Sequence, residues 1–173
     1  LYASDGSLLI EYAEERRVFI YYADMPPMLV NAFVAAEDQN FWTHPGIDVQ
    51  GIVRAAANNT LRMFGYNTTL SGASTITQQV AKNFFLTSER TISRKIKEAV
   101  LALQIEKELS KDEIITHYLN RAYFNGGAYG IEAASQYYFA KHASELDVPE
   151  AAMMAGLIQN PSKWSPIGFP ENA

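Results

Sequence analysis

The sequence predicts a mainly α-helical domain that follows a short N-terminal pair of β-strands. Apolar residues recur at helical spacing in most segments after residue 24, and Gly or Pro separates these segments. Three residue pairs match the capping box that opens a helix, namely Thr75 with Gln78, Ser110 with Glu113, and Asp147 with Glu150. These patterns place most of the chain in helices.

The first 22 residues, LYASDGSLLIEYAEERRVFIYY, read as two short strands. Asp5-Gly6 is a turn signal. The run RVFIYY is β-branched and aromatic, as strands prefer. We expect Asp24 to cap the helix that follows, with prolines in the first turn of that helix.

The first helix has an apolar face and runs into Glu37, and its apolar residues are Leu29, Val30, Phe33 and Val34. We expect the breaker His44-Pro45-Gly46 to end it. Residues 47–63 are again helical in pattern, with a predicted buried set of Ile47, Val49, Ile52 and Val53. The segment 62–73 is apolar yet irregular. Either it packs on the core, or it is a mobile flap that touches a membrane or an apolar substrate.

The later part of the chain reads as a series of helices. On the helix that begins at Ser74 or Thr75, one face carries Ile76, Val80 and Phe84. The next helix starts between Ser88 and Thr91, and its apolar run 99–103 predicts a buried middle. The rest of the sequence predicts a helix from Ser110 through Leu119, a helix over 131–141 and a last helix that ends at Asn160-Pro161. A turn is predicted at Gly126, Gly127 and Gly130.

The charge of the chain narrows the class of partner. The net charge of −5 argues against general nucleic-acid binding. The charge is uneven, because residues 82–97 hold five basic side chains and one acidic side chain, and this excess favours an anionic partner. The chain has no cysteine, so disulfides and thiolate metal sites are excluded.

The length of 173 residues suits one domain. No segment approaches the roughly 18 to 20 apolar residues of a membrane span, and no signal peptide is visible. Since the sequence begins at Leu1, we expect a fragment or a processed chain, with any membrane anchor upstream.

Two adjacent carboxylates, Glu37 and Asp38, follow an apolar stretch and precede Phe41 and Trp42. One reading is a frayed helix end with solvated charges. The other is a carboxylate in a partly apolar place, where its pKa rises and it can accept a proton near ambient pH. The carboxylates point to different sides of a helix, and His44 adds no spacing typical of a metal site.

The segment SGASTITQQVAKN combines a helix start with the small hydroxyls of Ser74 and Thr75. Free backbone N–H groups at a helix start form an anion site that suits phosphate. Gln78 and Lys82 lie four residues apart and share a helix face. The alternative is a well-capped surface helix with ordinary polar residues.

Glu98 lies among the basic residues Arg90, Arg94, Lys95 and Lys97. Its distance of four residues from Arg94 and three from Lys95 suits structural ion pairs. The functional reading is a carboxylate that helps to position a diphosphate or its bridging cation. The sequence has no nucleophile elbow, Walker loop or dinucleotide fingerprint.

Taken in order, five segments resemble the motifs of the family-51 glycosyltransferases, which polymerise peptidoglycan in class A penicillin-binding proteins and in monofunctional transglycosylases. The segments are EDQNFWTHPG, GASTITQQVAKN, RKIKEAVLA, KDEIITHYLNRAY and GAYGIEAASQYYFAK. The resemblance runs from about Val30 to Pro166. The strands before Asp24 also resemble the segment that follows the membrane anchor in bifunctional members of type 1a.

The resemblance implies a lysozyme-like helical fold with a smaller, mobile lobe near the membrane. The expected divisions are a strand pair and linker at 1–24, a glycosyltransferase domain at 25–166 with a flap at about 62–73, and the start of a C-terminal linker at 167–173. The implied partners are lipid II, the growing lipid-linked glycan, the membrane surface and a downstream transpeptidase domain, with no nucleic acid. The implied location is the extracytoplasmic face of the bacterial inner membrane.

The implied reaction inverts an α-linked sugar diphosphate to a β-1,4 glycosidic bond and releases undecaprenyl diphosphate. Glu37 would be the general base, and Glu98 would assist the leaving diphosphate, directly or through Mg²⁺ or Mn²⁺, with no tightly bound cofactor. The substrate-binding set would be Asp38, Phe41, His44, Ser74, Thr75, Gln78, Gln79, Lys82, Asn83, Arg90, Arg94, Lys95 and Lys97. Asp38 would mainly orient its surroundings, and Tyr118, Asn120 and Tyr123 would support the site from behind.

The chain departs from the family pattern at Ala73, Gly127 and Ala140, and at Asn125, where a Gly is displaced to position 126. These positions lie at turns or helix starts and bear on local geometry. Two rival functions stay open. A lysozyme-like lytic enzyme would use Glu37 as its acid, although a neutral glycan needs no basic cluster. A silent module would bind lipid-diphosphate sugars, although a pure anion binder gains nothing from acidic residues.

Overall fold

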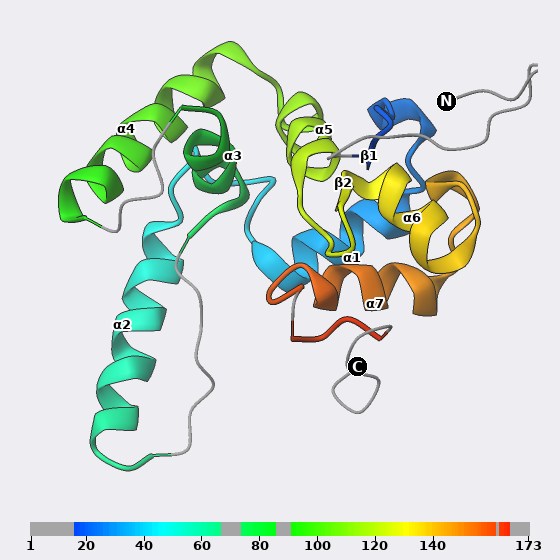
Figure 1. Cartoon of the computed structure of the whole chain (residues 1–173). Coiled ribbons are helices and arrows are strands. Elements are labelled where there is room, and N and C mark those ends of the chain that lie inside the picture. The colour runs from blue at the N-terminus through cyan, green and yellow to red at the C-terminus, as the bar shows by residue number, and fades with distance from the viewer. Residues whose placement is uncertain (1–15, 67–73, 86–90, 162, 167–173) are drawn as a thin grey trace, which may run out of the picture.

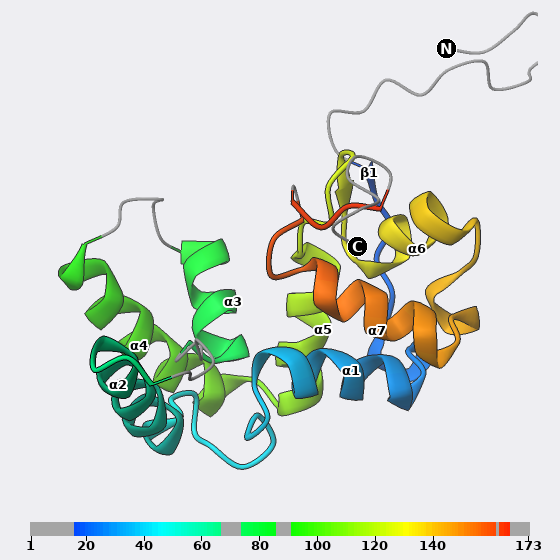
Figure 2. The same ribbon diagram turned by 90° about the horizontal axis from the view of Figure 1, so that it is seen from below.

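A computed structural model describes residues 16–66, 74–85, 91–161 and 163–166. In chain order the elements are β1 (Arg16–Arg17), the 3-10 helix η1 (Tyr22–Asp24), α1 (Pro27–Glu37), α2 (Val49–Met63), α3 (Ile76–Phe85), α4 (Ile92–Glu108), α5 (Lys111–Arg121), β2 (Ala128–Tyr129), α6 (Ile131–Phe139), the 3-10 helix η2 (Ala143–Glu145) and α7 (Val148–Leu157). The helices α2, α3 and α4 lie on one side of the molecule and α1, α5, α6 and α7 on the other (Figure 1, Figure 2). The predicted mainly helical fold is confirmed.

The N-terminal segment forms less strand than the sequence predicts. Of the run RVFIYY only the first residue is in a strand, and β1 pairs in parallel with β2 rather than with an N-terminal neighbour. The reason lies at Ile20, whose backbone N–H and C=O are both bonded by the Asn120 side chain, each at 2.8 Å. This amide takes the place of a partner strand. The expected first strand and its turn lie outside the described residues.

The first helix begins and ends differently from the prediction. Pro26 occupies the N-cap position and Asp24 lies in η1, so Asp24 does not cap α1. The predicted apolar face is buried, with Leu29 and Phe33 at its centre. The helix ends at Glu37 because Asp38 leaves helical geometry, and the His44-Pro45-Gly46 breaker begins seven residues after Glu37.

Most of the core lies in the lobe of α1, α5, α6 and α7, which we call the larger lobe, and the same buried cluster extends to Ile76, Val80 and Ala81 of α3 and to Ile105 of α4. In the larger lobe α1 packs against α7, and α5 packs against both α6 and α3. The large side chains that are fully buried include Leu29, Phe33, Phe41, Phe124, Ile114, Ile115, Leu119, Ile131, Met154 and Leu157. The predicted capping boxes of α5 and α7 are both present, so each helix begins where its local sequence indicates.

The smaller lobe, formed by α2, α3 and α4, leaves much of its apolar surface uncovered. The predicted burial of Val49, Ile52 and Val53 is wrong, since Val49 is 66% exposed and Ala55 is the residue of α2 that is buried. The predicted buried middle of α4 is confirmed at Ala102, which is fully buried, and Leu101 is half-buried, whereas the flanking Val100 and Leu103 are 50% and 39% exposed. The physical reason is that α2 extends away from the other helices, as Figure 1 shows, and α4 packs chiefly on α3.

Two departures from the family pattern are residues other than glycine that have left-handed backbone. Asn125 has a φ of 75° and Ala140, the C-cap of α6, has a φ of 55°. Gly126, Gly127 and Gly130 also have positive φ, which confirms the predicted turn. At Gly130 a Cβ would come within 2.7 Å of the Asn120 carbonyl oxygen, so the close approach of the chain requires glycine there. Within the described ranges, no helix has the length and apolarity that a membrane span requires.

Candidate active site

Glu37 is the last residue of α1 and is half-buried. One of its oxygens, Oε2, accepts a hydrogen bond of 2.8 Å from Nε2 of Gln79 on α3. Burial raises the pKa of the Glu37 carboxyl, the Gln79 amide lowers it, and the Asp38 charge adds a further rise. The net direction is upward, as the sequence predicts.

Asp38 is buried and bonded on several sides. His44 donates from Nε2 to its two oxygens at 3.0 and 2.9 Å, and the backbone N–H of Ile76 donates at 2.9 Å. The Gly46 N–H donates to Nδ1 of His44 at 3.0 Å, which assigns the proton of the neutral ring to Nε2. Asp38 therefore ties the end of α1 to the start of α3.

Phe41 is fully buried beside this loop, with its ring against those of Trp42 and His44. The Lys111 ammonium lies 4.5 Å from the Phe41 ring centre and donates to the His44 carbonyl at 2.8 Å. The same ammonium donates to Glu106 at 2.7 Å. The first residue of α5 thereby fixes the loop that follows Glu37.

The helix start at Thr75 has the predicted capping box, and the N–H groups of Thr75, Ile76 and Gln78 donate to acceptors of the protein. The N–H of Thr75 donates to Oε1 of Gln78, and the N–H of Gln78 donates to Oγ1 of Thr75. Asp38 accepts from Ile76, and Thr75 Oγ1 donates to the Gly46 carbonyl at 2.6 Å. These three N–H groups are therefore not free for a phosphate, contrary to the expectation, because the protein's own acceptors occupy them.

The basic cluster surrounds Glu98, which is 2% exposed. Arg94 and Lys95 both pair with its carboxylate, the latter at 2.9 Å, so the predicted ion pairs are confirmed. Lys95 also donates to Ser74 Oγ at 2.7 Å. Burial lowers the pKa of Lys95, as do the charges of Arg94 and Lys82.

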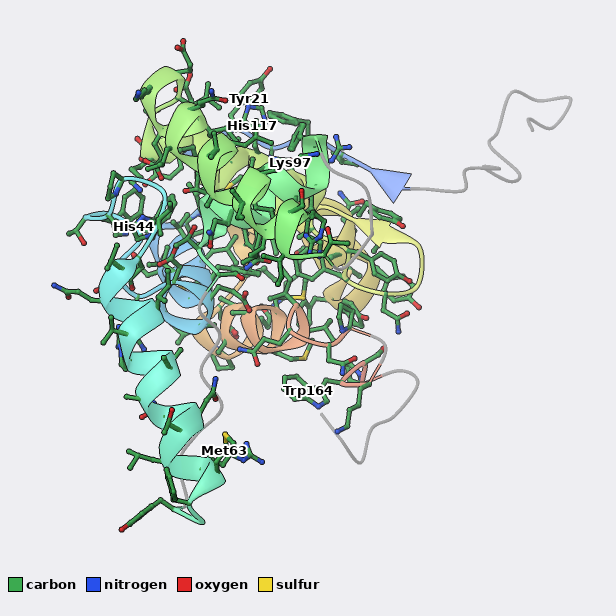
Figure 3. All side chains as sticks on the ribbon, turned by 90° about the vertical axis from the view of Figure 1, so that its left-hand side faces the viewer. Tyr21, His44, Met63, Lys97, His117 and Trp164 are labelled. Carbon is green, nitrogen blue, oxygen red and sulfur yellow. The ribbon has the colours of Figure 1, made fainter. Side chains whose placement is uncertain are left out.

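The other predicted members of the site are spread over the surface. Lys82, Asn83 and Lys97 are exposed, and Lys97 is seen on α4 in Figure 3, with His44 in the loop before α2. Arg90 lies outside the described residues. Helix α3 joins the two parts of the site, because Gln79 contacts Glu37 and Ser74, just before this helix, contacts Lys95.

The three residues predicted to support the site have different positions. The Tyr118 hydroxyl is buried and has no hydrogen-bond partner within the described part of the chain. Burial and the charges of Glu37 and Asp38 raise its pKa well above the usual range. Asn120 bonds Ile20, as described above, and Tyr123 is partly exposed with its ring against Tyr129.

A hydrogen-bond network that the sequence did not indicate joins the first turn of α3 to α4 and α5. Thr77 donates to Oε1 of Glu106 at 2.6 Å, and Lys111 donates to the same oxygen at 2.7 Å. Lys111 follows a capping serine and Glu106 lies in a charged helix end, so neither has a local signal. Only the packing of α3, α4 and α5 brings them together. Among the described residues, no group of three or more acidic, His or Cys side chains could hold a metal.

The arrangement combines a half-buried carboxylate with a cluster of cations. Comparisons with known proteins show the family to which the chain belongs. A family model described as Transglycosylase matches residues 5–173. Penicillin-binding protein 1A of Rickettsia prowazekii (strain Madrid E) is 49% identical over 166 residues, which is 96% of this chain and 21% of that protein. Penicillin-binding protein 1A of Neisseria gonorrhoeae is 48% identical over 173 residues, which is 100% of this chain and 21% of that protein. The chain thus spans about a fifth of the length of these relatives.

Proposed function

This chain belongs to the transglycosylase family and is a glycosyltransferase domain of peptidoglycan synthesis, and on that premise we propose that it polymerises lipid II into β-1,4-linked glycan strands. The reaction proceeds with inversion and releases undecaprenyl diphosphate. The observation that carries the proposal is the half-buried carboxylate of Glu37, joined through α3 to the cations around Glu98. A base and a receptor for an anionic leaving group are the two elements that this transfer needs.

Glu37 is the general base in this proposal. It accepts the proton of the 4-hydroxyl of the acceptor sugar while that oxygen attacks the anomeric carbon of the donor. Burial raises its pKa, which makes its carboxylate a stronger base than a solvated one. The neighbouring Asp38 has its oxygens bonded to His44 and Ile76, so its role is to hold the loop and the start of α3.

The cations stabilise the departing diphosphate as its negative charge develops. We assign this role to Lys82, Arg94, Lys95, Lys97 and, outside the described residues, Arg90. Glu98 orients two of these cations through its ion pairs. Since Arg94 and Lys95 already neutralise Glu98, we propose that a divalent cation such as Mg²⁺ or Mn²⁺ arrives with the diphosphate rather than residing in the protein.

The remaining members of the set surround the same helix. We propose that Ser74 and Asn83 present polar groups to sugar and phosphate oxygens, while Thr75, Gln78, Phe41 and His44 keep α3 and the loop in place, because Gln78 is buried and its amide oxygen caps α3. Tyr118, Asn120 and Tyr123 support this arrangement from the larger lobe.

The uncovered apolar face of the smaller lobe supports a membrane partner. Met63 is 87% exposed and lies at the far end of α2, away from the larger lobe (Figure 3). Such a surface fits the lipid substrate and the outer surface of the bacterial inner membrane. We place the domain on the extracytoplasmic side, with an anchor upstream and, because the relatives are about five times as long, a transpeptidase domain downstream.

A polymerisation assay tests the proposal. The chain is incubated with labelled lipid II and, separately, with purified cell-wall glycan. Long polymer is expected from the wild type and from Glu108→Gln, a control that removes an exposed charge on α4, and no polymer is expected from Glu37→Gln. Shortened glycan without polymer would contradict the proposal in favour of a lytic enzyme, and binding of lipid II without turnover would contradict it in favour of a silent module.

A further inference from the structure

The contact between Glu37 and Gln79 joins two lobes across 42 residues of sequence. Glu37 ends α1 in the larger lobe, whereas Gln79 lies one turn into α3 in the smaller lobe. The amide Nε2 lies 2.8 Å from Oε2, the distance of a good charge-assisted hydrogen bond. The resemblance to the family assigns Gln79 to substrate oxygens, yet in this structure its amide N–H is directed at the carboxylate.

The position of Gln79 is fixed independently of that contact. The backbone N–H of Gln79 donates to the Thr75 carbonyl at 3.0 Å, inside the first turn of α3. That turn is held by Asp38 through Ile76 and by Gly46 through Thr75. The loop directly after Glu37 therefore fixes the backbone position of Gln79. From that position the Gln79 amide bonds the carboxylate of Glu37.

The two oxygens of Glu37 differ as a result. Oε2 accepts the amide hydrogen, and Oε1 has no hydrogen-bond partner among the residues that the structure describes. A carboxylate with one oxygen held can rotate little, so the other oxygen points in one direction. Holding a reacting group within a narrow range of orientations contributes much of the rate acceleration of an enzyme.

Resting on the proposed role of Glu37, we propose that Gln79 is a positioning residue, whose amide holds Oε2 so that Oε1 is the oxygen presented to the acceptor hydroxyl. In the transfer step the acceptor O–H bond breaks and its proton goes to Oε1. The acceptor oxygen bonds to the anomeric carbon, and the bond from that carbon to the diphosphate oxygen breaks with its electron pair. Gln79 exchanges no proton in this step.

The amide also opposes the effect of burial on Glu37. An N–H that donates to a carboxylate favours its charged form, and the Gln79 amide accordingly lowers the pKa of Glu37 while burial raises it. Loss of the amide leaves burial and the Asp38 charge unopposed. The carboxylate would then be protonated up to a higher pH, so the acid limb of the rate profile should move upward.

The test compares two matched variants, Gln79→Met and Gln136→Met. Gln136 on α6 makes the same kind of contact, from Nε2 to Glu132 Oε1 at 2.7 Å, in the larger lobe and away from the proposed site. With labelled lipid II, Gln79→Met should lower kcat about 10- to 100-fold with little change in KM, and should move the acid limb of kcat/KM to higher pH. Gln136→Met should leave that limb unmoved.

A rise in KM with an unmoved acid limb would overturn the inference, because it would mean that Gln79 only binds substrate. A ¹³C titration of the Glu37 carboxyl gives a readout that needs no turnover, and its midpoint should rise in Gln79→Met. An unchanged midpoint would overturn the inference as well. If Gln79→Met fails to fold by circular dichroism, Gln79→Glu keeps the length of the side chain and should move both readouts further upward.

The proposed function fails on a different result. Polymer from Glu37→Gln would show that Glu37 is not the base, whatever the titration of Gln79→Met gives. If Glu37→Gln makes no polymer, as expected, but the titration midpoint of Glu37 is unchanged in Gln79→Met, the proposed function holds and only the positioning role of Gln79 is refuted.

Discussion

The larger and the smaller lobes contain helices of similar apolar pattern, yet they bury that pattern to different extents. In α1 the predicted residues Leu29 and Phe33 are fully buried, whereas in α2 the predicted residues Val49 and Val53 are about two thirds exposed. Helical spacing indicates which face of a helix is apolar. It does not indicate whether the same chain covers that face, and an uncovered face is available to a membrane or a lipid.

The strongest test of this contrast truncates one phenylalanine in each lobe. Phe33→Ala should lower the free energy of unfolding by about 4 kcal/mol, because it opens a cavity in a packed core. Phe64→Ala, at the end of α2, should change it by less than about 0.5 kcal/mol, because that ring is 77% exposed. Urea denaturation of both variants measures the difference. A comparable loss in the two variants would mean that the chain covers the α2 face after all.

The joint between the lobes should be the next most sensitive place. Asp38→Ala leaves the Nε2 proton of His44 and the N–H of Ile76 without their acceptor, so we expect a loss of about 3 kcal/mol. The control Asp147→Ala removes an N-cap within the larger lobe and should cost about 1 kcal/mol. The same urea experiment compares them, and equal losses would refute a special role for Asp38.

The uncovered face makes a third prediction. Val53→Ser should weaken binding to lipid vesicles about 10-fold, since a buried valine contributes about 1.5 kcal/mol to such binding, while unfolding in urea stays nearly unchanged. The control Val148→Ser alters a valine that is similarly exposed but starts α7 in the larger lobe. Flotation of the protein with vesicles measures the affinity. Equal weakening by both substitutions would argue against a membrane-binding face on α2.

The smallest expected effect concerns the left-handed cap of α6. Ala140 has a φ of 55°, which costs an L-residue about 1 kcal/mol more than glycine, so Ala140→Gly should raise the free energy of unfolding by up to about that amount. The control Ala152→Gly, on the exposed side of α7, should lower it by about 1 kcal/mol. Thermal unfolding of the two variants should therefore shift the melting temperature in opposite directions, upward for Ala140→Gly and downward for Ala152→Gly.

Features that depend on neighbouring residues were predictable from the sequence. The capping boxes at Thr75, Ser110 and Asp147 need only a span of four residues, and all three are present. The ion pairs of Glu98 with Arg94 and Lys95 follow from helical spacing alone. The rise in the pKa of Glu37 followed from its apolar setting and from its neighbour Asp38.

Features that depend on distant residues were not predictable in this way. The sequence predicts a free N–H at Ile76 that could bind a phosphate. In the structure this N–H donates to Asp38, which lies 38 residues away in the sequence. Two other features also depend on side-chain hydrogen bonds to residues outside the local segment. Helix α1 ends at Glu37, where Asp38 binds His44, and the predicted strand is absent near Ile20, where Asn120 binds the backbone. The contact of Gln79 with Glu37 likewise has no local signal.

If Glu37 is a base whose proton affinity is raised by burial, a ¹³C titration of its carboxyl should show this without any turnover. We expect a midpoint above the ordinary glutamate value of 4.5, together with a polymerisation rate that falls as the pH drops through that same midpoint. A midpoint at or below 4.5, or a rate that does not follow the titration, would contradict that role of Glu37.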